Sequence, residues 1–134
     1  MSTTTAVKTA RTLIAAATSN TAGSTTRGTV DLRTASGGVL TIRLTNGGTG
    51  PTVQASANVL IAHNTGSTPT AGSAGADWKT IWSFGGGTTA SAVTEQSIAV
   101  DAGVMHLEVE VTGNTGQTVT CEAFLSELSS FTTV

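Results

Sequence analysis

The sequence predicts an all-β fold, an antiparallel β-sandwich of the jelly-roll type with about eight strands. Apolar and polar residues alternate over short segments, and the breaks between these segments are rich in Gly, Asn and Thr. No segment shows a convincing helical periodicity. We expect residues 1–134 to form one domain, with a short N-terminal arm (1–6) and a C-terminal tail (129–134).

The clearest alternation lies between residues 101 and 128. Its first half has an apolar phase (Met105, Leu107, Val109, Val111) and a polar phase (His106, Glu108, Glu110, Thr112). Its second half sets Val119, Cys121, Ala123 and Leu125 against Thr118, Thr120, Glu122 and Phe124. The residues between the halves, Gly113-Asn114-Thr115-Gly116, tolerate a positive φ. The pattern predicts a β-hairpin with one buried face and one solvated face.

Two earlier regions also indicate strands. Residues 7–18 contain Thr and Val, which favour a strand, although Ala15-Ala16-Ala17 favours a helix; the strand is the preferred interpretation. Residues 28–34 and 39–45 flank Ser36-Gly37-Gly38 and predict a second hairpin. Its expected inward residues are Val30, Leu32, Leu40, Ile42 and Leu44.

The middle of the chain contains two further predicted strands and a long loop. Residues 52–63 are expected to turn Val53, Ala55, Ala57, Val59 and Ile61 inward. Residues 64–76 have the composition of a long exposed loop, and such loops are often functional. Residues 77–84 are expected to place Trp78, Thr80, Trp82 and Phe84 on one face. Residues 88–100 are mixed but strand-like.

The charge composition argues against nucleic acid and membranes as partners. Only 10% of the residues are charged, the net charge is −2, and the six Lys and Arg residues are scattered. Binding to phosphates needs clustered cations. No stretch reaches the ~20 apolar residues of a membrane span, and residues 13–17 are too short for the apolar core of a secretory signal. We expect a protein that is made in the cytoplasm and used or assembled there.

The sequence contains no recognisable catalytic, cofactor or metal site. His106, Glu108 and Glu110 share a strand face, but a solvated surface is preferred over metal ligation or acid–base catalysis. His63 is interpreted as a loop-edge residue without a function. The glycine clusters precede Thr rather than a helix, which indicates turns and not phosphate cradles. Cys121 is the single cysteine, and its inward phase predicts a buried, inert thiol.

The aromatic residues allow two interpretations. Trp78, Trp82 and Phe84 share one predicted phase, so core packing is the preferred interpretation. A sugar-stacking platform made by Trp78 and Trp82 is the alternative, which would make the chain a carbohydrate-binding module or a phage tail appendage. Phe124 and Phe131 fall outside the predicted core and are better candidates for an interface.

Two segments resemble the small decoration or cement proteins of tailed-bacteriophage capsids. One is Gly103–Thr120, and the other is Trp78…Trp82-Ser83-Phe84 with the Gly/Thr-rich turn that follows it. The resemblance implies a jelly-roll protein that binds in many copies to the outside of an icosahedral shell. There it would clamp neighbouring major capsid proteins, as a homodimer or homotrimer. No catalytic residue comes with the resemblance.

These observations predict a structural virion protein, assembled in the host cytoplasm, with the major capsid protein and other copies of itself as partners. The expected contact segments are residues 1–10, residues 131–134 and the loop 64–76. The interface candidates are Thr3, Thr4, Thr5, Val7, Thr68, Pro69, Phe124, Phe131 and Val134. A surface poor in charge loses little hydration energy when it docks.

Overall fold

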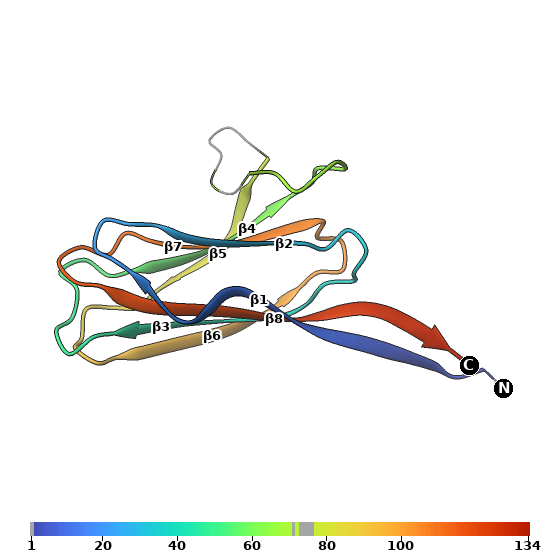
Figure 1. Ribbon diagram of the computed structural model, residues 1–134, viewed down its shortest axis with the longest axis horizontal. Helices are drawn as coiled ribbons and strands as arrows, with labels where there is room; N and C mark the ends of the chain where they lie inside the picture. Colours follow the sequence, from blue (N-terminus) through green and yellow to red (C-terminus); the bar gives the residue numbers. More distant parts are fainter. Residues whose placement is uncertain (1, 71, 73–76) are drawn as a thin grey trace.

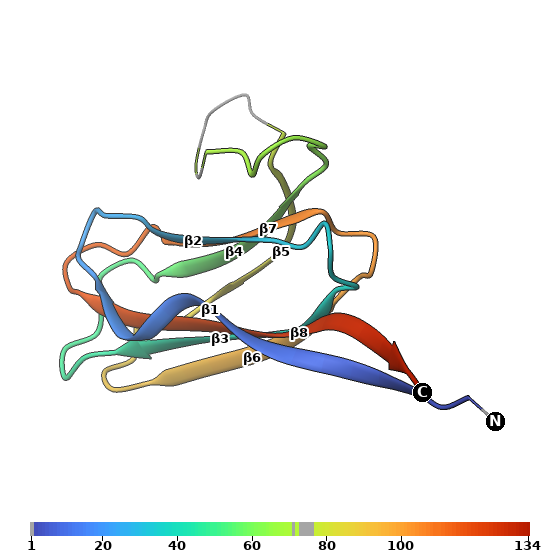
Figure 2. The same ribbon diagram turned by 45° about the vertical axis from the view of Figure 1, so that its right-hand side comes forward.

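The computed structural model describes residues 2–70, 72 and 77–134, which form a sandwich of two antiparallel four-stranded sheets (Figure 1, Figure 2). The first sheet has the order β1 (Thr4–Asn20), β8 (Val119–Thr133), β3 (Gly38–Asn46), β6 (Val93–Val100). The second has the order β2 (Thr26–Asp31), β7 (His106–Thr112), β4 (Ser56–Ala62), β5 (Lys79–Gly85). This order is that of a jelly roll, so the predicted fold class is confirmed.

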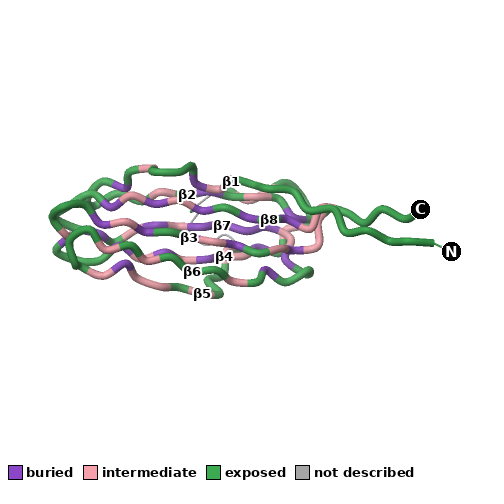
Figure 3. The backbone as a smooth tube through the Cα atoms, turned by 90° about the horizontal axis from the view of Figure 1, so that it is seen from below, coloured by how far each residue is buried: buried purple, intermediate pink, exposed green. Residues whose placement is uncertain are grey.

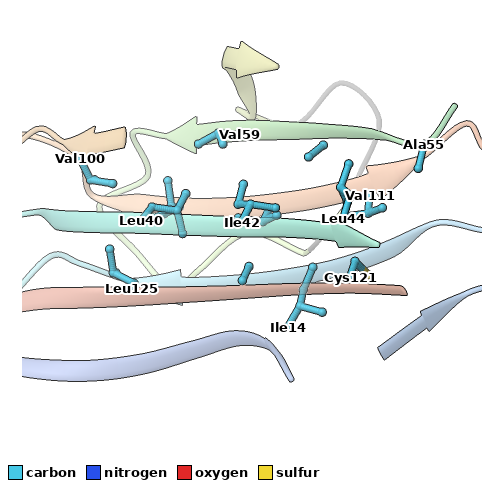
Figure 4. Packing of buried hydrophobic residues seen from close by; sticks show 14 of the residues in the cluster. Ile14, Leu40, Ile42, Leu44, Ala55, Val59, Val100, Val111, Cys121 and Leu125 are labelled. Carbon is cyan, nitrogen blue, oxygen red and sulfur yellow. The ribbon is translucent and has the colours of Figure 1, made fainter. Parts of the chain in front are cut away.

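The core consists of the inward phases of both sheets, and Figure 4 shows their side chains between the two layers. Leu40, Ile42 and Leu44 of β3 meet residues of β4 and β7 that are equally buried. The inward phases predicted for residues 40–44, 107–111 and 119–125 are therefore confirmed. Val53 is an exception, because β4 begins only at Ser56 and Val53 makes just an isolated bridge, which leaves it 51% exposed.

The single cysteine lies inside this core, as the sequence predicts. Cys121 is buried on β8, and burial raises the pKa of its thiol to about 11. The thiolate is the reactive form of cysteine, so this residue is protected both by packing and by its protonation.

Both predicted hairpins are wrong in their pairing. β7 pairs with β2 and β4, whereas β8 pairs with β1 and β3, so the two halves of the stretch 101–128 lie in different sheets. β2 and β3 are separated in the same way. Alternation reports which face of a strand is buried, and strands that face each other across a core have the same pattern as strands that share hydrogen bonds.

The first and last strands extend beyond the sandwich as a two-stranded projection (Figure 1, Figure 2). We call residues 3–10 and 128–134 the terminal ribbon. The backbone N–H and C=O groups of Thr3 and Val134 exchange two hydrogen bonds at 2.8 and 2.9 Å at its tip. The predicted arm (1–6) and tail (129–134) lie in this ribbon, where residues 4–7 pair antiparallel with residues 130–133. Each supplies the backbone partners that the other needs.

Candidate functional site

Two regions carry the candidate residues, and the first is a polar row on the outer face of the second sheet. The polar row consists of His106, Glu108 and Glu110 on β7, the strand between β2 and β4. Its predicted outward phase is correct, but its predicted solvation is wrong, because His106 and Glu108 are fully buried. We call the described residues between β4 and β5, which are 63–70, 72, 77 and 78, the covering segment, and it lies over this face (Figure 1).

Glu108 is a buried carboxylate. Its Oε1 accepts the backbone N–H of Gly72 at 3.1 Å and lies 3.7 Å from Nη1 of Arg27. Its Oε2 has no hydrogen-bond partner among the described residues. Arg27 pairs more closely with Glu110, whose other oxygen accepts from Asn58 Nδ2 at 2.8 Å. Burial raises the pKa of Glu108, and the charge of Arg27 offsets only part of this effect.

His106 fastens the start of the same covering segment. Its Nε2 lies 2.9 Å from the carbonyl oxygen of Asn64, so Nε2 carries the hydrogen. Its Nδ1 faces Asp31 at 3.8 Å and has no hydrogen-bond partner in the part of the chain that the structure describes. Asp31 is held by a fork from Arg33 at 2.7–3.1 Å, and these hydrogen bonds lower its pKa to about 2. Arg33 also donates to the carbonyl oxygen of Thr65 at 2.8 Å.

The polar row therefore acts as an attachment for the covering segment. Two of its contacts reach backbone groups of that segment, from His106 to Asn64 and from Glu108 to Gly72, and Arg33 beside the row adds a third contact, to Thr65. Among residues 2–70, 72 and 77–134, no three His, Cys, Asp or Glu side chains are placed to hold a metal ion. In the same part of the chain, no helix is long and apolar enough to cross a membrane.

The raised pKa of Glu108 predicts how stability depends on pH. A folded state with a raised carboxyl pKa binds more protons than the unfolded state. The contribution of Glu108 to the free energy of unfolding is therefore largest in acid, and it falls as the pH rises from the ordinary value of 4.5 through the raised one. We expect Glu108→Gln to remove this fall and to be at least as stable as the unmodified protein at pH 7.

Urea unfolding between pH 4 and pH 8 measures this difference. Glu95→Gln, on β6 at the far edge of the other sheet, is the matched control for the substitution itself. The expectation would be contradicted if the free energy of unfolding of Glu108→Gln changed with pH in the same way as that of the unmodified protein.

The two tryptophans lie in different environments, so the prediction that they share one face is wrong. A register shift in the pairing of β4 with β5 places Trp82 opposite Val59 but Thr80 opposite Leu60, which leaves Ile81 as an extra residue. A one-residue shift turns the following side chains to the other face of the sheet. Trp82 and Phe84 pack against the core with ring centroids 5.1 Å apart, which confirms core packing for this pair.

Trp78 belongs instead to the covering segment. Its Nε1 donates to the carbonyl oxygen of Thr70 at 3.1 Å. A sugar-stacking platform needs ring faces that lie together on an open surface. Trp78 and Trp82 are on either side of the register shift and do not provide one.

The second candidate region is the terminal ribbon, which brings together most of the interface candidates. Figure 3 shows both of its strands exposed. Val7 is 37% exposed, Phe131 59% and Val134 82%, although all three are apolar. Thr3, Thr4 and Thr5 lie on the strand opposite Phe131 and Val134. The sequence contained a signal for the two strands, since both ends of the chain contain Thr and Val, which favour strands, but it contained no signal for their pairing.

The remaining interface candidates lie elsewhere. Phe124 is 37% exposed on β8, within the sandwich and opposite Thr12 and Thr41. Thr68 and Pro69 are half-buried in the covering segment. The predicted contact loop 64–76 includes residues 71 and 73–76, which lie outside the described residues, as does Met1 of the contact segment 1–10.

A groove of about 330 Å³ lies where the terminal ribbon leaves the sandwich. Lys8 and Leu128 line it from the ribbon, and Val39 and Ser126 from the adjoining sheet. Val39 is 51% exposed. An exposed apolar groove thus adjoins an exposed apolar projection.

Comparisons with known proteins give structural similarity only. No protein-family model and no curated protein sequence matches the chain. The K3 cleaved adhesin domain of Lys-gingipain from Porphyromonas gingivalis w83 aligns at TM-score 0.55 and 10% identity, over 81% of this chain and 72% of that one. A chain of the T13 IBDV viral particle aligns at TM-score 0.51 and 9% identity, over 91% of this chain and 31% of that one.

A phage-derived structure is also similar, at a lower score. The SPBc2 prophage-derived protein YomS aligns at TM-score 0.43 and 18% identity, over 90% of this chain and 93% of that one. Identities this low show a shared fold and do not transfer a function. The chain is therefore similar in fold to jelly-roll domains found in an adhesin and in a viral particle.

Proposed function

We propose that this chain is a structural virion protein without catalytic activity, which binds in many copies to the outer surface of an icosahedral phage capsid and stabilises it. The terminal ribbon is the observation that carries the proposal. It is a two-stranded projection with exposed Val7, Phe131 and Val134. A two-stranded ribbon is only marginally stable in water by itself, so docking on a neighbour would complete it.

The chemistry of the ribbon suits attachment to protein. Lys8 is the single charged side chain in residues 3–10 and 128–134, so docking displaces little water from charges. Exposed strand edges bind other sheets through backbone hydrogen bonds. Many copies on one particle would add such weak contacts into a large stabilisation. The fold is compatible with this role, since a chain of the IBDV particle has a similar one.

Co-sedimentation with shells that lack this protein tests the proposal. The full chain is expected to travel with the shells in a density gradient. Removing residues 1–5 is expected to weaken binding by about tenfold or more while the sandwich stays folded, because many weak contacts are lost at once. Thr49→Lys, an exposed change in the loop between β3 and β4, is the control and should bind normally.

Two results would contradict the proposal. One is a full chain that stays at the top of the gradient with every shell preparation. The other is a truncated chain that binds as well as the full chain, which would remove the ribbon from the contact. Circular dichroism of the truncated chain separates a loss of binding from a loss of folding.

A further inference from the structure

Strand β8 has an open edge along the terminal ribbon. Within the sandwich β3 pairs with one side of β8, and this pairing ends where Gly38 lies opposite Glu127. Leu128 makes the last contacts on that side, with the backbone of Ser36 and Gly37 at 2.8 and 2.9 Å. Beyond Leu128, β8 pairs with β1 alone among the residues that the structure describes.

Alternate residues of β8 direct their backbone N–H and C=O groups toward the open edge. Val134 directs both its N–H and its C=O to Thr3. Successive residues of an antiparallel strand direct these groups to opposite sides. Thr133 and Phe131 therefore direct theirs away from β1, toward the open side. Exposed edges are usually protected by charge or proline, and residues 129–134 (SSFTTV) contain neither.

We propose that this edge pairs with the same edge of a second copy of the chain, about a two-fold axis at Phe131. The second copy runs antiparallel, so Phe131 lies opposite Phe131 and Ser129 lies opposite Thr133. This register confines the pairing to residues 129–133 of each copy, beyond the backbone contacts that Leu128 makes with Ser36 and Gly37. The inference deepens the proposed function by naming a partner of the ribbon.

The groove at the base of the ribbon supports a second copy as the occupant. The register brings Val134 of one copy to the base of the other copy's ribbon, where Leu128 and Val39 line the groove. Each copy thus provides both an exposed apolar end and an apolar groove that receives one. Such self-complementarity closes a dimer and leaves no open end for a filament.

The charges also favour this pairing over pairing through β1. No charged residue lies in 129–134, so the proposed axis brings no like charges together. A two-fold axis through the middle of the other edge, residues 4–12, would set Lys8 opposite Lys8. Like charges directly opposite each other destabilise a strand pair.

Disulfide trapping in the purified full chain tests the register. Residues directly opposite in a hydrogen-bonded pair have Cα atoms ~5.5 Å apart, which is the usual span of a disulfide. Phe131→Cys is expected to form a covalent dimer under mild oxidation at least ten times faster than two controls. Val7→Cys tests the β1 side, and Phe124→Cys tests an exposed position inside the sandwich. The unmodified chain, whose single cysteine is the buried Cys121, shows how much covalent dimer forms without an introduced cysteine.

Sedimentation equilibrium of the unmodified chain supplies the independent readout. We expect a concentration-dependent mass that approaches twice the 13.3 kDa of the monomer. Thr133→Pro removes an N–H on the open side and should shift the mass toward the monomer without lowering the melting temperature. Thr132→Pro removes an N–H that faces β1 and should loosen the ribbon itself.

A chain that stays monomeric, or equal trapping at Val7→Cys and Phe131→Cys, would overturn the inference. Neither result depends on shells, so a failed dimer and a failed capsid association are distinguishable. A monomer that nevertheless binds shells would assign the open edge to a strand of the capsid protein.

Discussion

Replacing Asn114 by alanine is expected to lower the free energy of unfolding by about 3 kcal/mol or more, because each buried polar group left unpaired costs about 1–3 kcal/mol. The Asn114 side chain is fully buried. Its Oδ1 accepts from Asn20 Nδ2 at 2.6 Å, and its Nδ2 donates to the carbonyls of Asn20 and Gln117 at 3.0 and 2.9 Å. These bonds fasten the end of β1 to the connection between β7 and β8.

Urea unfolding followed by tryptophan fluorescence measures this loss. Gln117→Ala is the matched control, since Gln117 is exposed and contributes its backbone carbonyl to the network, which alanine retains. A loss below about 1 kcal/mol for Asn114→Ala would mean that water replaces the missing amide, because a replaced hydrogen bond costs little.

Gly28→Ala is expected to destabilise the protein by about 3 kcal/mol, at the upper end of the range for overpacking. A Cβ atom at this position would lie 1.9 Å from the carbonyl oxygen of Leu13, so the two backbones could not keep their separation. Leu13 lies in an irregular part of β1, where the register with β8 shifts on either side of Ile14. The missing side chain of Gly28 lets this irregular part approach β2.

The same unfolding experiment tests this prediction, with Gly48→Ala as its control. A Cβ at Gly48 meets no atom within 4 Å, and Gly48 lies in the exposed loop between β3 and β4. Equal stability of the two variants would show that β1 moves away from β2 without cost. A broad, non-cooperative transition for Gly28→Ala alone would indicate that β1 detaches before the rest of the sandwich.

The polar row shows where sequence reasoning reaches its limit at a candidate site. Alternation placed His106, Glu108 and Glu110 on the outer face correctly. It could not show that another segment covers two of them, because Asn64 and Gly72 have no periodicity that links them to β7. The sequence therefore predicts a solvated surface for these residues, whereas in the structure His106 and Glu108 are buried and hold the covering segment.

The terminal ribbon shows a different limit. Each end of the chain was recognised as polar and as a candidate contact segment. The residue pattern of one strand does not specify which other strand pairs with it. The pairing of Thr4 with Thr133 could therefore not be predicted from either end alone. The pairing is what turns two exposed segments into one projecting surface with an open edge.

The sequence by itself determined the fold class, the approximate strands and the inward faces of β2, β3, β4, β7 and β8, because a period of two follows from strand geometry and burial. It also determined that the surface carries little charge. The tertiary structure alone decided which strands share hydrogen bonds. In a jelly roll a strand's neighbour in the chain often lies across the core, as β8 does from β7, and the inward side chains are the same in both arrangements.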